Sequence, residues 1–128
     1  MNTILLPDGT AIPKVGQGTW YLGEDPHKRA SELEALQWGI ENGLTLIDTA
    51  EMYGEGASEE LVGEAIRPFQ RDHLFLVSKV YPWNAGKSQI LIPVRTVWTA
   101  LEPITWIYIF FTGEAVFRSG KQFPAWSS

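Results

Sequence analysis

Strand and helix signals alternate along residues 2–86, and this alternation constrains the fold more than any other feature of the sequence. Two short apolar stretches, at residues 4–6 and 12–15, flank Pro-Asp-Gly-Thr at 7–10. Proline, aspartate and glycine all favour turn conformations, so this segment predicts an opening β-hairpin. A further short stretch, Gly-Gln-Gly-Thr-Trp at 16–20, leads into the first predicted helix.

Two helices are predicted in this part of the chain. Ser31 and Glu34 match a capping box, in which each side chain accepts a hydrogen bond from a free amide of the first turn, and Gly43 marks the end of that helix. Ser58 is expected to cap a second helix, which carries apolar residues on one face and closes at Pro68.

Two buried strands complete the pattern. Residues 44–47 form an apolar run that ends at Asp48, and residues 74–77 form another that delivers Lys79 at its end. A strand–helix–strand–helix–strand order implies right-handed crossovers and a parallel sheet. The predicted fold class is therefore α/β.

Residues 87–128 lose this order. Between residues 88 and 112 only Arg95 and Glu102 are charged, and Pro93 and Pro103 interrupt any regular element. The apolar residues there follow neither the period of a strand nor that of a helix. We expect an irregular tail, distinct from the domain at residues 1–86.

Composition excludes several classes of function. A net charge of −5 argues against nucleic-acid binding, which needs clustered basic residues, and the lack of cysteine excludes thiol catalysis and thiolate metal sites. Neither His27 nor His73 has neighbours that indicate a metal site. The N-terminal segment lacks the pattern of a signal peptide, and the apolar run at 104–111 is too short to span a bilayer. We expect a cytoplasmic protein with neither nucleic-acid nor membrane partners; its oligomeric state is not predicted.

Asp48, Tyr53 and Lys79 form the chemically informative group. Asp48 and Lys79 lie at the carboxyl ends of apolar strands, which is where a parallel barrel holds its active site, and Tyr53 follows in the next loop. An ammonium beside a phenol favours the ionised phenol, and a carboxylate keeps the ammonium charged, so the trio suits proton donation to a carbonyl oxygen. Spacing alone also allows a structural alternative, in which Asp48 caps a turn, Lys79 lies on the surface and Tyr53 packs.

Three segments, LPDGTAIPKVGQGTW, GLTLIDTAEMYGEGASEELVGEAI and LFLVSKVYPWNAG, resemble the start of the aldo-keto reductases. The pattern DTAxxYGxGxSExxxGxAI within them is long and specific. The resemblance implies a (β/α)8 TIM barrel opened by a β-hairpin, of which residues 1–86 hold the first three β/α units. It also implies NADPH-dependent reduction of aldehydes or ketones, with a small-molecule carbonyl substrate.

The resemblance also implies roles for individual residues. Tyr53 would be the proton donor, with Asp48 and Lys79 tuning it. The cofactor-binding residues would be Gly18, Thr19, Trp20 and Asp48, and the substrate-binding residues Trp20 and Trp83. No metal ion is implied.

The family pattern stops near Gly86. The family continues with a helix and a strand that ends in a catalytic histidine, and neither is visible in the protein sequence. A codon frame shifted by one base offers an explanation. Each codon of that frame consists of the last base of one residue's codon and the first two bases of the next. Because tryptophan has the single codon TGG, the residue pairs 98–99 and 106–107 then both encode aspartate. With permitted codon choices, the shifted frame from Val97 through Gly113 encodes S-L-D-R-L-G-T-D-Y-L-D-L-Y-L-L-H-W, which resembles the missing segment.

We therefore predict that the reading frame slips between about residue 85 and residue 91, so that the tail at 87–128 is out-of-frame translation. Resequencing the coding DNA checks this. The prediction is wrong if adding or removing one base in that interval opens no full-length reductase frame.

The shifted tail has consequences for folding and activity. Three in-frame strands cannot close a barrel, and exposed sheet edges and apolar faces favour aggregation. Two alternatives therefore stand beside an active reductase. One is a truncated, catalytically inactive product, and the other is a non-enzymatic module that binds a nicotinamide cofactor. Retention of Asp48, Tyr53 and Lys79 together favours catalytic ancestry over the binding module.

Overall fold

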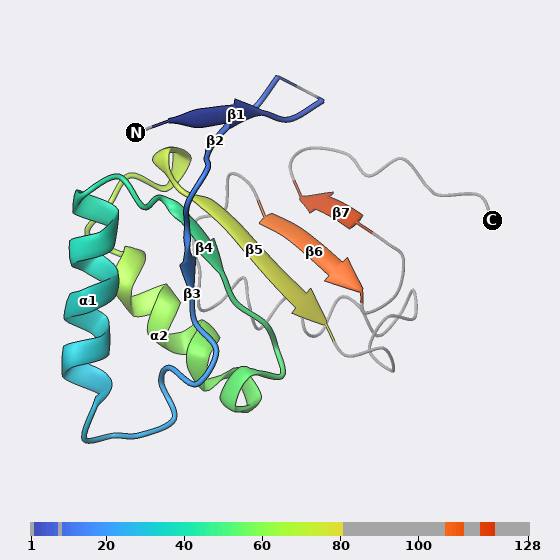
Figure 1. Ribbon diagram of the computed structural model, residues 1–128. Helices are drawn as coiled ribbons and strands as arrows, with labels where there is room; N and C mark the ends of the chain where they lie inside the picture. Colours follow the sequence, from blue (N-terminus) through green and yellow to red (C-terminus); the bar gives the residue numbers. More distant parts are fainter. Residues whose placement is uncertain (1, 8, 81–106, 112–115, 120–128) are drawn as a thin grey trace.

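One sheet of four parallel strands and an antiparallel edge strand carries the fold (Figure 1). The computed structural model describes residues 2–7, 9–80, 107–111 and 116–119. In their order across the sheet, the strands are β3 (Gln17–Gly18), β4 (Leu46–Asp48), β5 (Phe75–Val80), β6 (Ile107–Phe111) and β7 (Val116–Ser119). The prediction of an α/β fold with a parallel sheet is confirmed for the described residues.

The opening hairpin is also confirmed. β1 (Thr3–Leu5) pairs antiparallel with β2 (Ala11–Pro13) in a separate two-stranded sheet. Gly9 has a φ of +86° in the connecting turn, and its amide donates to the Leu6 carbonyl at 2.8 Å. Glycine adopts such a φ without steric cost, which is why it suits this position.

Helix α1 (Arg29–Glu41) begins earlier than the sequence predicted. A turn precedes it, in which the Lys28 amide donates to the Asp25 carbonyl at 3.0 Å, and no side chain caps the helix. The Ser31 hydroxyl lies inside the first turn and donates to the Lys28 carbonyl at 2.8 Å. The predicted capping box is therefore wrong, because the preceding turn already fixes where the helix begins.

Gly43 ends α1 as predicted. Its φ is +89°, its amide donates to the Ile40 carbonyl at 3.0 Å, and the Leu44 amide donates to the Gly39 carbonyl at 2.9 Å. These two bonds satisfy carbonyls that the end of a helix leaves free, in the manner of a Schellman motif. The chain then turns directly into β4.

Helix α2 (Ala57–Ile66) follows the 3-10 segment η1 (Tyr53–Gly56). Its N-cap is Gly56, with a φ of +95°, so the prediction that Ser58 caps the helix is wrong. Ser58 is buried in the first turn, and its hydroxyl bonds to Thr19 and not to the end of the helix. The helix stops just before Pro68, as expected.

The two helices pack side by side and cover one face of β4 and β5 (Figure 1). A short 3-10 segment, η2 (Arg71–His73), leads from α2 to β5. The buried apolar side chains between helices and strands form the core: Leu36, Ile40, Ile47, Leu61, Val62, Ala65, Ile66, Leu74 and Leu76. This burial stabilises the layer that places the carboxyl ends of β4 and β5.

The expectation of a wholly irregular tail is wrong for residues 107–111 and 116–119. β6 pairs parallel with β5, and β7 pairs antiparallel with β6. β6 consists of β-branched and aromatic residues only, which favour strands. Periodicity missed it, because a run that is apolar throughout has no alternation to detect.

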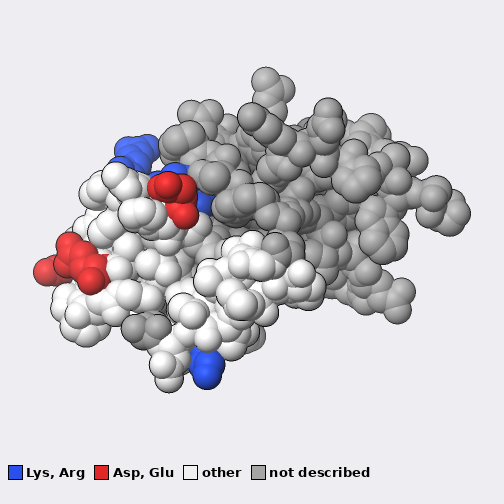
Figure 2. Space-filling model, turned by 90° about the horizontal axis from the view of Figure 1, so that it is seen from above, with Lys and Arg blue, Asp and Glu red and all other residues white. Residues whose placement is uncertain are grey.

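The described strands form an open sheet, with β3 and β7 at opposite edges. The closed barrel implied by the family resemblance is therefore not seen within the described part of the chain. On the face shown in Figure 2, the basic side chains of that part lie at separate places and form no single basic surface. Among the residues described, no helix is long and apolar enough to cross a membrane.

Candidate active site

The carboxyl ends of β4 and β5 bring two charged side chains together. Asp48 is the last residue of β4, and its partner in the parallel register is Val77. Lys79 lies two residues further along β5 and so extends on the same face as Val77. Tyr53 begins η1, in the connection that follows β4.

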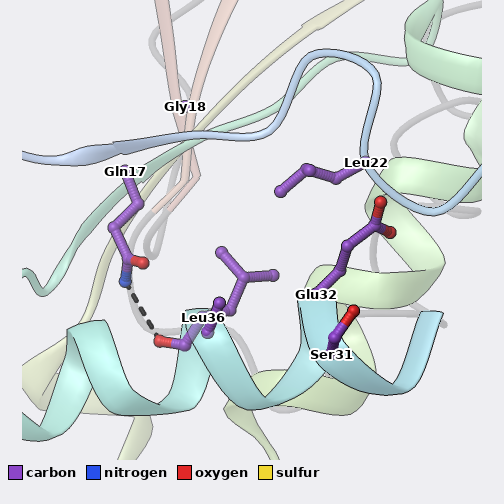
Figure 3. A pocket seen from close by; sticks show the side chains of 7 residues that line it. Gln17, Gly18, Leu22, Ser31, Glu32 and Leu36 are labelled. Atoms are coloured by element: carbon purple, nitrogen blue, oxygen red, sulfur yellow. Dashed lines mark hydrogen bonds between the residues drawn. The ribbon is translucent and has the colours of Figure 1, made fainter. Parts of the chain in front are cut away.

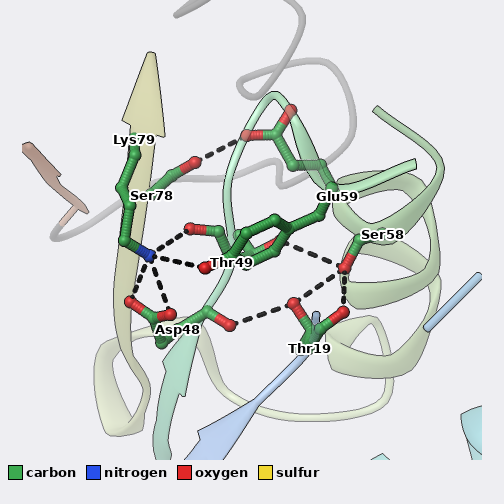
Figure 4. A network of polar contacts seen from close by, with 8 residues as sticks. Thr19, Asp48, Thr49, Ser58, Glu59, Ser78 and Lys79 are labelled. Atoms are coloured by element: carbon green, nitrogen blue, oxygen red, sulfur yellow. Dashed lines mark hydrogen bonds and ion pairs between the residues drawn. The ribbon is translucent and has the colours of Figure 1, made fainter. Parts of the chain in front are cut away.

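The Lys79 ammonium is the centre of this site (Figure 4). Its Nζ donates to the two carboxylate oxygens of Asp48 at 2.7 and 2.8 Å, and to the Thr49 carbonyl at 3.1 Å. The same Nζ lies 3.3 Å from the Tyr53 hydroxyl oxygen and 5.1 Å from the centre of that ring. The carboxylate and the carbonyl thus hold the ammonium against the phenol.

The Asp48–Lys79 pair is partly open to solvent. The side chain of Lys79 is 27% exposed and that of Asp48 is 41% exposed. Water screens a pair of this kind, so its contribution to stability is about 0–1 kcal/mol. Its main effect is therefore to fix a positive charge beside the Tyr53 hydroxyl.

Trp20 forms an exposed aromatic wall beside Tyr53. The Trp20 side chain stacks on Tyr21 with ring centres 4.7 Å apart, and on Tyr53 with centres 6.2 Å apart. Trp20 is 63% exposed. Tyr21 has a φ of +68°, a conformation that costs a bulky residue about 1–3 kcal/mol and that clusters at functional sites.

A cluster of buried hydroxyl groups, formed by Thr19, Thr49 and Ser58, lies behind the site (Figure 4). Thr19 Oγ1 donates to the Asp48 carbonyl at 2.9 Å. Ser58 Oγ lies 2.7 Å from Thr19 Oγ1, 2.8 Å from the Thr19 carbonyl and 3.3 Å from Thr49 Oγ1. The cluster ties the first turn of α2 to the ends of β3 and β4. The sequence reading missed it, because these contacts join residues up to 39 positions apart.

Ser58→Ala is expected to lower the free energy of unfolding by about 1–3 kcal/mol, since it leaves buried polar partners without their hydrogen bonds. Denaturant unfolding of the two proteins measures the difference. Ser31→Ala is the matched control, because Ser31 is exposed and its loss should change stability by no more than about 0.5 kcal/mol. Equal effects at the two positions would contradict the importance of the buried cluster.

Glu59 and Ser78 form a second buried contact that the sequence reading missed. They are 2% and 1% exposed, and Ser78 Oγ donates to Glu59 Oε1 at 2.6 Å. Burial raises the pKa of Glu59 to about 7; the bond from Ser78 opposes this change, and the charge of Glu51 adds to it. The available signal was strand alternation, which puts Ser78 on the same buried face as Leu76.

The structure brings Asp48, Tyr53 and Lys79 together, as the sequence suggested, and places Trp20 beside them. Gly18 ends β3 with no heavy atom within 4 Å of where a Cβ would lie. Thr19 is fully buried, and its hydroxyl donates to the Asp48 carbonyl. Trp83 lies outside the described residues. The catalytic and binding roles of all these residues stay predictions.

A separate hollow of about 340 Å³ lies between β3 and α1 (Figure 3). Gln17 closes one side, where its Nε2 donates to the carbonyls of Leu36 and Leu44 at 3.1 and 3.0 Å. Glu32 lies on another side and accepts the Gly23 amide at 2.8 Å. The lining includes neither Lys79 nor its partners, but it does include Gly18, one of the predicted cofactor-binding residues.

Comparison with known proteins relates residues 14–92 to the aldo/keto reductase family, whose sequence model matches this range. Methylglyoxal reductase YeaE of Escherichia coli is 63% identical over 81 residues, which are 63% of this chain and 28% of that protein. Aldo-keto reductase YhdN of Bacillus subtilis is 37% identical, over 60% of this chain and 24% of that protein. The chain thus spans about a quarter of the length of these curated relatives.

Solved structures of aldo-keto reductases are also similar to this chain. A crystal structure of an aldo-keto reductase from Klebsiella pneumoniae in complex with NADPH has a TM-score of 0.73 and 46% sequence identity. The match covers 82% of this chain and 36% of that one. The similarity therefore extends to the arrangement of the strands and helices as well as to sequence.

Proposed function

This chain belongs to the aldo/keto reductase family, and from this premise we propose that it provides the catalytic residues for NADPH-dependent reduction of aldehyde or ketone carbonyls to alcohols. One observation carries the proposal. The Lys79 ammonium contacts both the Asp48 carboxylate and the Tyr53 hydroxyl. An ammonium in this position stabilises the phenolate that forms when the hydroxyl gives up its proton.

Each of the three side chains has a distinct role in the proposed reaction. As a hydride adds to the carbonyl carbon, Tyr53 donates its hydroxyl proton to the carbonyl oxygen, which leaves an alcohol and a phenolate. Lys79 stabilises the negative charge of that phenolate, and Asp48 keeps the ammonium directed at it. Solvent then returns the proton to the phenolate, and the partial exposure of the pair supports this step.

The residues present fit the nicotinamide end of the cofactor. The open space at Gly18 leaves room for a flat ring against the end of β3, and the exposed indole of Trp20 lies two residues further along the chain. We propose that Gly18, Thr19, Trp20 and Asp48 hold this end of the cofactor, Thr19 through its main chain because its side chain is buried. NADPH, when bound, supplies the hydride.

We propose a small carbonyl compound as the substrate, with methylglyoxal as the first to test. The 63% identity to a protein named methylglyoxal reductase supports this choice. The exposed face of Trp20 beside Tyr53 offers an apolar surface for the carbon part of such a compound. Trp83 is proposed to contribute to the same surface.

A second candidate is a product of this family that turns over no substrate. It is favoured by the open sheet of the described residues, since the active site of a barrel draws on the ends of several different strands. It is favoured too by the extent of the family model, which matches the chain only as far as residue 92. A third candidate, a module that binds the cofactor without catalysis, differs from the second in having cofactor affinity.

A cofactor-oxidation assay separates the three. The purified chain is mixed with NADPH and methylglyoxal, the fall in NADPH absorbance is followed, and cofactor binding is titrated in parallel. Turnover that is lost in Lys79→Met and kept in Lys28→Met supports the reductase, since Lys28 is an exposed lysine whose ion-pair partner is Asp25. Binding without turnover favours the cofactor-binding module, and neither signal favours the inactive product.

A further inference from the structure

The buried carboxyl group of Glu59 lies directly behind the strand end that carries Lys79. Glu59 belongs to the first turn of α2, and it accepts the hydroxyl of Ser78 at 2.6 Å. Ser78 is bonded covalently to Lys79. Since successive side chains of a strand point to opposite faces, Ser78 is directed at α2 while Lys79 is directed at Asp48 (Figure 4).

The main chain at this point is held from the other side by the connection after β4. The Thr49 amide donates to the Val77 carbonyl at 2.8 Å, and the Glu51 amide donates to the Lys79 carbonyl at 2.9 Å. The strand end is therefore fixed along this edge by these main-chain bonds, along the other edge by pairing with β6, and on its helix-facing side by Glu59. No other side-chain bond to Ser78 or to the Lys79 main chain is found in the described part of the chain.

We propose that Glu59 is a positioning residue of the candidate active site: it fixes Ser78, and through Ser78 the main chain from which Lys79 reaches Asp48 and Tyr53. The inference rests on the proposed function, in which Lys79 serves the Tyr53 hydroxyl. A glutamate 2% exposed to solvent is costly to keep in its charged form. Groups of this kind gather at functional sites, where geometry matters more than stability.

The electrostatic surroundings of Glu59 make its ionisation a usable signal. Burial raises its pKa to about 7, and Glu51, in the connection after β4, adds to this change. On α2 itself the next residue, Glu60, is exposed, and on β5 the nearest charge, Lys79, is bound to Asp48. A bond from a hydroxyl to a carboxylate is about twice as strong as one to a neutral acid. Lys79 is thus held more firmly once Glu59 is ionised.

Nuclear magnetic resonance of the full chain tests this without need of turnover. The Lys79 amide and side-chain signals, assigned with Lys79→Arg, are followed from about pH 5 to about pH 9. We expect them to shift with a midpoint near the pKa of Glu59, about 7, in the wild type and in Glu60→Gln, and not in Glu59→Gln. An inflection that persists in Glu59→Gln, or its absence from the wild type, overturns the proposal. If a variant does not fold, the wild-type titration still tests the proposal, because the absence of an inflection there overturns it.

Turnover provides the second measurement. Ser78→Ala is expected to lower kcat by about 10- to 100-fold with little change in KM, because a small displacement of a catalytic group is enough for such a loss. Ser78→Thr, which keeps the hydroxyl, should restore kcat. Unchanged kcat in Ser78→Ala contradicts the role. If no protein turns over but the Lys79 signals follow Glu59, the proposed function fails and the positioning contact stands.

Discussion

Tyr53→Phe is expected to lower kcat/KM for carbonyl reduction by about 10²–10⁴-fold, the usual contribution of a positioned proton donor. The change removes one oxygen atom and leaves the ring that stacks on Trp20. The Lys79 ammonium keeps its contacts with Asp48 and the Thr49 carbonyl, so the site should retain its shape. Steady-state NADPH oxidation with methylglyoxal measures the loss.

Tyr21→Phe is the matched control. Tyr21 also stacks on Trp20, but it is 66% exposed, and no hydrogen bond of its hydroxyl is found among the described contacts. Its kcat/KM should stay close to that of the unchanged chain. Similar losses in the two variants would show that aromatic packing, and not proton donation, is what the Tyr53 change disturbs. The same pair can be compared in the full-length frame, if resequencing opens it.

Glu59→Gln is expected to raise the free energy of unfolding by about 3 kcal/mol above pH 7. The pKa of this carboxyl rises from 4.5 to about 7 in the folded chain, chiefly through burial. Between these two values the unfolded chain has lost the proton and the folded chain still holds it. The stability that the protonated group provides is therefore complete below pH 4.5 and is lost as the pH rises to about 7.

Denaturant unfolding at a series of pH values checks this slope. The wild-type chain should lose stability between pH 4.5 and about pH 7 by an amount that Glu59→Gln no longer shows. Glu60→Gln removes the same charge from the neighbouring, exposed position on α2 and should keep the slope. A slope that is equally steep in Glu59→Gln would mean that other groups cause it.

Local sequence signals predicted the features that depend on local structure. The turn at 7–10 predicted the hairpin, and Gly43 predicted the end of α1. The apolar runs before Asp48 and Lys79 predicted β4 and β5. The parallel sheet then implied that the carboxyl ends lie together, which the Asp48–Lys79 contact bears out. The family resemblance added the roles, which the geometry by itself does not assign.

The features that sequence reasoning missed depend on contacts between distant residues. A serine near a helix start predicts a cap at both Ser31 and Ser58, although a preceding turn or a glycine begins each helix. The Ser58 hydroxyl bonds to Thr19, and the Ser78 hydroxyl bonds to Glu59, which no short pattern reveals. β6 was missed because a uniformly apolar strand carries no periodic signal.

Asp48, Tyr53 and Lys79 all come from one continuous segment of the chain, which bears on when their contacts can form. Asp48 and Lys79 are 31 positions apart, and Tyr53 lies 26 positions from Lys79, with both connections inside the segment that runs from the end of β4 through α2 into β5. The entropy cost of closing a loop grows only slowly with its length, so the 31 positions between Asp48 and Lys79 add little to that cost. Since a chain is made from its N-terminus, Lys79 can meet its partners while later residues are still being synthesised. In this family's longer members, the remainder of the protein would then assemble around an active centre that already has its shape.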